Sequence, residues 1–220
     1  GYLSVPVVLS GTFYLIPIFL HEQNLQPGLS NRFLSVFAKK ITVGFYETVN
    51  FFPKRKVIFT GNPIREKIIE CNRSEGEKRL NLIPSKFNIL IFGGSQGAKK
   101  INEVFVDSLK LMDNKLLEKI QIIHLTGEKY LGEIEKKYQN IMVERKTFKY
   151  LDEIELAYSV ADLVIARSGA MTITELLFKK IFRILIPYPF ATEEHQRINA
   201  GYLTNKNMAY LIEETELTTQ

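Results

Sequence analysis

Residues 161–175 read ADLVIARSGAMTITE, and this stretch decides the fold. The apolar run at 163–166 predicts a buried strand, and the residues RSG after it predict a turn into a helix that begins near Ala170. A strand that enters a helix through such a turn places unpaired backbone N–H groups and the positive end of the helix dipole at one edge of the sheet. The stretch therefore predicts a phosphate site.

Glu175 lies about a turn and a half into that predicted helix. A carboxylate there would repel phosphate, but it could accept hydrogen bonds from two neighbouring sugar hydroxyls. Together with the phosphate site, it suggests a nucleotide with a ribose and a diphosphate. The alternative is an ordinary surface carboxylate, and only the adjoining residues 167–172 favour the ligand interpretation.

Strand and helix patterns alternate along the chain, which predicts an α/β fold with a parallel sheet covered by helices on both faces. The charged and polar segment 66–86 indicates a domain boundary, with a hinge near 63–65 and domains at 1–65 and 66–220. Strands are expected at 16–20, 41–45, 56–60, 87–92, 120–125, 141–145, 163–166, 183–187 and 208–212. Helices are expected at 4–12, 29–39, from the 93–98 loop to about 118, 129–139, 151–160, from 170 onwards, and at 193–206.

Composition sets broad limits on function. The chain has 220 residues, 45% of them hydrophobic and 24% charged, so it can bury a substantial core. The net charge of +5 fits an anionic partner such as a nucleotide, nucleic acid or acidic lipid, but the basic residues are too dispersed to choose among them. The single cysteine, Cys71, excludes an internal disulfide. His21, His124 and His195 lack metal-ligand spacing, so no metal is predicted.

Residues 1–20 contain no charge, which raises the possibility of a membrane span. Pro6, Gly11 and Pro17 interrupt the apolar run, and a span requires an uninterrupted one. We therefore expect a core helix at 4–12 and a buried strand at 16–20. The chain begins inside an element and not at a methionine, so we expect a fragment.

Three polar loops follow predicted strands: HEQN at 21–24, GNPIR at 61–65 and GGSQGA at 93–98. Loops after parallel strands are where open α/β sheets bind ligands. The glycines of the third loop would let backbone amides approach a phosphate, although a simple tight turn is the alternative. Its spacing is neither the dinucleotide fingerprint nor a Walker A loop. Phe148 and Tyr150 could stack on a base or fill the core.

These motifs, together with ADLV at 161–164, RSGA at 167–170, Thr172, Glu175 and HQRINA at 195–200, resemble the MurG family in order and spacing. Members of that family transfer N-acetylglucosamine from UDP-N-acetylglucosamine to lipid I, the undecaprenyl-diphosphate-linked muramoyl pentapeptide, and so form lipid II for peptidoglycan. The resemblance implies two Rossmann-like domains of the GT-B type, the first incomplete, and an inverting mechanism without metal or other cofactor. It also implies a peripheral enzyme on the cytoplasmic face of the bacterial membrane, held on an anionic surface, with no nucleic acid partner.

The resemblance also implies roles for individual residues. Tyr150 and the backbone of Leu151 would contact uracil, and Glu175 would hold the ribose hydroxyls. The diphosphate would meet Ser95, Arg65 and the amides of Ala170, Met171 and Thr172. His195, Gln196 and Asn199 would contact the sugar, and Asn24 would face the cleft from the first domain.

Part of the family pattern lies outside this chain. The first Gly-rich loop, with the family's proposed catalytic-base histidine, falls upstream of Gly1, so we assign no base and expect donor binding even without turnover. The alternatives are another UDP-sugar transferase with a lipid acceptor, or a nucleotide-sugar-binding module without catalysis. An oxidoreductase is disfavoured because no dinucleotide fingerprint follows a strand.

Overall fold

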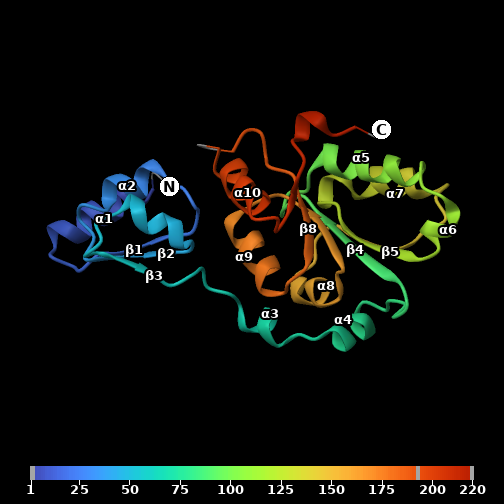
Figure 1. Ribbon diagram of the computed structural model, residues 1–220, viewed down its shortest axis with the longest axis horizontal. Helices are drawn as coiled ribbons and strands as arrows, with labels where there is room; N and C mark the ends of the chain where they lie inside the picture. The colour runs from blue at the N-terminus through green and yellow to red at the C-terminus, as the bar shows by residue number, and fades with distance from the viewer. Residues whose placement is uncertain (1–2, 192–193, 219–220) are drawn as a thin grey trace.

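Two parallel sheets form the framework of the chain (Figure 1). The structure, a computed structural model, describes residues 3–191 and 194–218. The first sheet has the strand order β1-β2-β3, and the second has the order β6-β5-β4-β7-β8-β9. Every strand pair in both sheets is parallel. The predicted α/β class is therefore confirmed.

The elements follow one another in the predicted alternation. The strands are β1 Phe19–Glu22, β2 Lys40–Val43, β3 Val57–Phe59, β4 Phe87–Phe92, β5 Ile120–Leu125, β6 Glu144–Phe148, β7 Leu163–Ala166, β8 Phe182–Leu185 and β9 Tyr210–Leu211. The α-helices are α1 Ser4–Phe13, α2 Leu29–Leu34, α3 Glu66–Glu70, α4 Arg73–Arg79, α5 Lys99–Leu109, α6 Asn114–Leu117, α7 Leu131–Tyr138, α8 Ile154–Val160, α9 Ala170–Phe178 and α10 His195–Asn205.

Several predicted boundaries are displaced. The helix expected to reach 118 is two helices, because the Asp113 carboxylate accepts a hydrogen bond from the Lys115 amide and starts α6. The strand expected at 141–145 begins at Glu144 instead. Residues 66–86 contain the short helices α3 and α4. The start expected at 193 for the helix before 206 lies outside the described residues.

The second sheet has the strand order of a Rossmann fold. Counted within this sheet, β4 to β9 lie in the order 3-2-1-4-5-6. The order reverses between β4 and β7, which lie side by side, with Ile91 opposite Ile165. In open α/β sheets, ligands bind at such a switch point, outside the carboxyl ends of the strands. The loop GGSQGA after β4 and the turn RSG after β7 both lie there.

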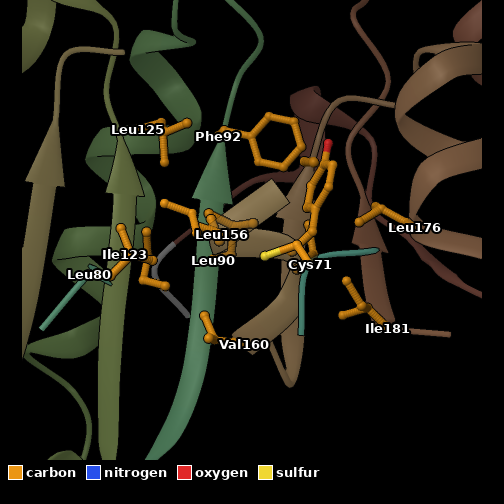
Figure 2. Close-up of a cluster of buried hydrophobic side chains, with 14 of the residues drawn as sticks. Cys71, Leu80, Leu90, Phe92, Ile123, Leu125, Leu156, Val160, Leu176 and Ile181 are labelled. Carbon is orange, nitrogen blue, oxygen red and sulfur yellow. The ribbon is translucent and has the colours of Figure 1, made fainter. Parts of the chain in front are cut away.

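Helices cover both faces of the second sheet, so its central strands are buried on both sides. All six residues of β5 are buried. One face packs against α3, α4 and α8, where Leu90 and Ile123 meet Leu156 and Val160 (Figure 2). The other packs against α5, α6 and α7. This double layer of apolar packing makes the second sheet a rigid support for the loops at its edge.

His124 of β5 belongs to a buried polar network. Asn102 donates from Nδ2 to the Thr126 carbonyl at 2.8 Å, which leaves its Oδ1 to accept from His124 Nε2 at 3.1 Å. The other ring nitrogen, Nδ1, then accepts from the Tyr138 hydroxyl at 3.0 Å. Because burial disfavours the charged ring, His124 is neutral, and its proton then lies on Nε2.

This network predicts a loss of stability in mild acid. Burial lowers the pKa of His124 to about 3, whereas an unfolded histidine titrates near ~6.5. Between these values only the unfolded chain takes up the proton, so the free energy of unfolding falls as pH falls. We expect protonation of His124 in the unfolded chain to lower the free energy of unfolding by about 1 kcal/mol between pH 7 and pH 5.5. Urea denaturation measures it, and His124→Gln should lack this part of the pH dependence; the same slope in both proteins would contradict the assignment.

The expectation that α1 and the strand after it lie in a core is wrong. Of the residues in α1 only Val8 is buried, whereas Phe13 is 81% exposed and Leu15, just after the helix, is 90% exposed. The strand itself begins at Phe19, which is 66% exposed. An apolar sequence shows that a segment prefers an apolar environment, not which surface provides it. In the described part of the chain, no helix has the length and apolar content that crossing a membrane requires.

Candidate functional site

Two adjoining pockets lie at the switch point of the second sheet. The first, of about 220 Å³, and the second, of about 450 Å³, share Phe92, Gly94, Ser95 and Thr172 in their walls. The shared residues come from the end of β4, the loop after it and the first turn of α9. The two pockets therefore meet where the Gly-rich loop faces the start of α9.

The Gly-rich loop is a tight turn held against its neighbour. Gly97 donates from its amide to the Gly94 carbonyl at 3.0 Å, and both glycines have positive φ, +91° at Gly94 and +73° at Gly97. A Cβ on Gly97 would lie 2.0 Å from the Thr126 carbonyl oxygen. Only glycine therefore allows this close approach of two backbones. Ser95, at the tip, is exposed to the pockets.

The start of α9 offers backbone donors to the same space. Its N-cap residue is Gly169, which has no side chain to occupy the free amides of the first turn. Gly169 and Thr172 line the second pocket, and Ala170 and Met171 complete this turn. The positive end of a nine-residue helix therefore faces the Gly-rich turn.

Glu175 lies deeper on α9 and lines the first pocket. It is buried, and its Oε1 lies 3.5 Å from Nη2 of Arg65, which follows β3. Burial raises the pKa of Glu175, whereas Arg65 and Tyr158 act to lower it. The carboxylate is thus held ready to accept hydrogen bonds at the bottom of a pocket, with a cation beside it.

The loop before α8 closes the first pocket on its other side. Tyr150 and Leu151 line this pocket, and Tyr150 is 55% exposed. Phe148, at the end of β6, packs against the core below the sheet. Of the two alternatives for these aromatics, the structure therefore places Phe148 in the core and leaves Tyr150 open to a ligand.

The residues expected to contact the sugar lie at the joint between the two sheets. Asn199 of α10 is 1% exposed, because its Oδ1 accepts from the Leu25 amide at 3.1 Å and its Nδ2 donates to Asn24 Oδ1 at 3.2 Å. His195 lies near Gly28, and Gln196 lines the second pocket while its Oε1 accepts from the Tyr188 amide. The hydrogen bond between Asn24 and Asn199 thus joins the half of the chain that holds the first sheet to the half that holds the second.

A second contact ties the halves together near Glu175. Asn62 Oδ1 accepts a hydrogen bond from His21 Nε2 at 2.9 Å, and Asn62 Nδ2 donates to Thr174 Oγ1 at 2.9 Å. A Cβ on Gly44 would lie 2.1 Å from Asn62 Oδ1, so glycine there makes room for this amide. Figure 1 shows α9 and α10 on the side of the second sheet that faces β1, β2 and β3.

The structure thus brings most of the predicted residues to one place. Around the two pockets lie Arg65, Ser95, Tyr150, Leu151, Thr172, Glu175 and Gln196. Sequence reasoning missed residues that support them: Asn102 and Thr126 hold the loop beside Gly97, and Tyr158 lies against Glu175. An asparagine one turn into the helix after the Gly-rich loop was the available signal for the first of these. Among the described residues, no group of three or more His, Cys, Asp or Glu side chains is placed to hold a metal ion.

Family models and solved structures agree with this geometry. The model described as glycosyltransferase family 28 C-terminal domain matches residues 88–220, and the model for the N-terminal domain of that family matches residues 1–43. The chain belongs to glycosyltransferase family 28. It is similar to the crystal structure of MurG from Acinetobacter baumannii, with a TM-score of 0.78 and 29% identity over 100% of this chain and 60% of that one. The predicted GT-B architecture and the resemblance to the MurG family are confirmed.

Curated relatives cover nearly the whole chain. Proteins from Halothermothrix orenii and Thermodesulfovibrio yellowstonii are 44% and 40% identical over 99% of this chain, and both are named UDP-N-acetylglucosamine–N-acetylmuramyl-(pentapeptide) pyrophosphoryl-undecaprenol N-acetylglucosamine transferase. The chain spans about 60% of the length of these relatives. A UDP-GlcNAc 2-epimerase from Neisseria meningitidis bound to UDP-GlcNAc, with a TM-score of 0.63 and 16% identity over 94% of this chain and 60% of that one, shares the fold.

Proposed function

We propose that this chain binds UDP-N-acetylglucosamine and, as a hexosyltransferase, takes part in moving N-acetylglucosamine to lipid I to form lipid II. One observation carries the proposal: α9 offers an open N-terminus and, further along, the buried carboxylate of Glu175, both beside the Gly-rich turn. The open helix N-terminus suits a diphosphate, and the carboxylate suits the hydroxyls of a ribose. Their spacing within one helix suits a nucleoside diphosphate. The names of the relatives supply the sugar and the acceptor.

The proposed placement of the donor follows the two pockets. Uracil lies in the first pocket against Tyr150 and the backbone of Leu151, and its ribose meets Glu175. The diphosphate lies where the pockets join, within reach of Ser95 and of the amides at the start of α9. The sugar extends into the second pocket towards Gln196.

Two other proposed sugar contacts require a rearrangement. Asn199 and Asn24 bond to each other in this structure, so Asn199 can reach a sugar only after that bond opens. His195, at the start of α10, lies beside the same joint. We therefore propose that residues 1–65 provide the acceptor side and residues 66–220 the donor side, with the sugar between them.

The proposed reaction inverts the configuration at the anomeric carbon of the sugar. An acceptor hydroxyl attacks the anomeric carbon from the face opposite the diphosphate, and the bond from that carbon to the phosphate oxygen breaks with its electron pair. The UDP that leaves gains negative charge, which Arg65 and the N-terminus of α9 stabilise. The hydroxyl proton passes to a base, and we assign no residue of this chain to that role.

The names of the relatives give the acceptor a membrane lipid, undecaprenol. We propose peripheral attachment to the cytoplasmic face of the bacterial membrane, where lipid I would be the acceptor.

Calorimetry with UDP-N-acetylglucosamine, ATP and NAD tests the donor assignment. We expect the uridine nucleotide to bind at least about tenfold more tightly than the other two, since a pocket built to hydrogen-bond one base leaves its polar groups unpaired with another. A preference for NAD or ATP would contradict it. Transfer of radiolabelled N-acetylglucosamine to lipid I, compared with transfer to diacylglycerol, tests the acceptor separately.

A further inference from the structure

The ion pair between Arg65 and Glu175 joins two groups that the proposed function assigns to different parts of one ligand. Glu175 would hold the ribose, and Arg65 would meet the diphosphate, yet in this structure Arg65 Nη2 lies 3.5 Å from Glu175 Oε1. The carboxylate that a ribose needs is therefore already in contact with a cation. Both side chains line the first pocket.

The two partners of this pair differ in how freely they move. The Glu175 side chain is 10% exposed on α9, and the Arg65 side chain is 54% exposed on the segment that joins β3 to α3. Changing partner is therefore easy for Arg65 and difficult for Glu175. The distance of 3.5 Å is at the long end for a charged hydrogen bond, which fits a contact that is readily exchanged.

The surroundings make the buried carboxylate dependent on a partner. Burial acts to protonate Glu175, Glu155 acts in the same direction, and Arg65 and Tyr158 oppose them. Tyr158 remains a hydrogen-bond donor to Glu175, and Arg65 adds the positive charge that offsets the burial of the carboxylate until a ligand hydroxyl takes its place. The diphosphate, in turn, offers Arg65 a stronger acceptor than a single carboxylate oxygen.

We propose that Arg65 makes the site selective for ligands that carry both a ribose and a diphosphate, because it occupies Glu175 until phosphate oxygens draw it away. This inference rests on the proposed function. A nucleoside alone must displace Arg65 and gives it no new partner. A nucleoside diphosphate supplies that partner. Its binding free energy therefore exceeds the sum of the binding free energies of its nucleoside and diphosphate parts.

The test compares uridine with UDP on the chain and on Arg65→Gln, by calorimetry at pH 8. Uridine should bind the variant about two- to fivefold more tightly, the range that removal of a partly exposed ion pair allows. UDP should bind it about tenfold more weakly, because a charged hydrogen bond to phosphate is lost. The ratio of UDP to uridine affinity should therefore fall more than tenfold. If the role of Arg65 were purely structural, Arg65→Gln would bind both uridine and UDP more weakly.

Controls separate this inference from the proposed function. Arg55→Gln makes the same change of charge at an exposed position before β3 and should leave both affinities unchanged. If the unchanged chain fails to bind UDP, the proposed function is wrong. If it binds UDP while Arg65→Gln leaves uridine affinity unchanged or weaker, only the competition by Arg65 is refuted. Should Arg65→Gln fail to fold, Arg65→Lys, which keeps the charge and loses the fork of donors, should shift both affinities in the same directions by less.

Discussion

Replacing Gly97 with alanine should destabilise the chain by about 2–5 kcal/mol and abolish donor binding. A non-glycine residue in the left-handed region costs about 1–2 kcal/mol, and forcing a methyl group into a packed site adds about 1–3 kcal/mol. Both costs apply, because Gly97 has φ of +73° and its Cβ would lie 2.0 Å from the Thr126 carbonyl oxygen. Urea denaturation measures the loss of stability, and calorimetry with UDP measures the loss of binding.

Gly94 provides a matched control within the same turn. Its φ is +91°, but no described atom lies within 4 Å of the position that a Cβ would take. Gly94→Ala should therefore cost only the backbone part, about 1–2 kcal/mol. Equal losses in the two variants would show that the contact between the turn and Thr126 does not determine stability. That result would also remove the argument that β5 supports the Gly-rich loop.

Glu175→Ala should weaken the binding of UDP and of UDP-N-acetylglucosamine by about 1–3 kcal/mol. The substitution removes the charged group that would accept hydrogen bonds from the ribose hydroxyls in a buried site. Glu175 is 8% exposed and lines the first pocket, so a ligand there meets its carboxylate directly. Calorimetry measures the affinity, and circular dichroism shows whether the variant is folded. Unchanged affinity in a folded variant would refute the assignment to the ribose.

A second ligand makes this test specific for the ribose. The chain should bind UDP more tightly than its 2′-deoxy form, and Glu175→Ala should bind the two equally, because the missing hydroxyl then has no acceptor to lose. Glu133→Ala, at an exposed position on α7, serves as a control of equal size and charge and should preserve the preference. A preference that survives in Glu175→Ala would place the ribose elsewhere.

Local pattern was enough to predict the second sheet and the start of α9. The apolar run of β7 and the turn RSG after it are contiguous, so the strand, the turn and the helix could be inferred without knowledge of distant residues. The strand order could not, because it depends on which strands pair across the sheet. β4 pairs with β7, more than seventy residues later. The two-domain GT-B architecture is inferred from the family resemblance and not from periodicity.

The errors have physical causes of their own. β6 is expected three residues early because Ile141 and Val143 are apolar, whereas the strand lies at the sheet edge and most of its residues are polar, with the last four half-buried. The burial of Asn199 depends on Asn24, 175 residues earlier in the chain, and no local signal carries such a contact. α1 was expected in a core because its sequence is apolar, and its neighbours in the fold leave most of it exposed.

The helix α9 also touches the other half of the molecule, through Thr174 to Asn62 and through Glu175 to Arg65. Under the proposed function the same helix also contacts a nucleotide, so nucleotide binding and the packing of the two halves are linked equilibria, and the linkage runs in both directions. A force that shifts the halves between two arrangements would change the affinity for the proposed nucleotide by the same factor by which the nucleotide shifts that equilibrium.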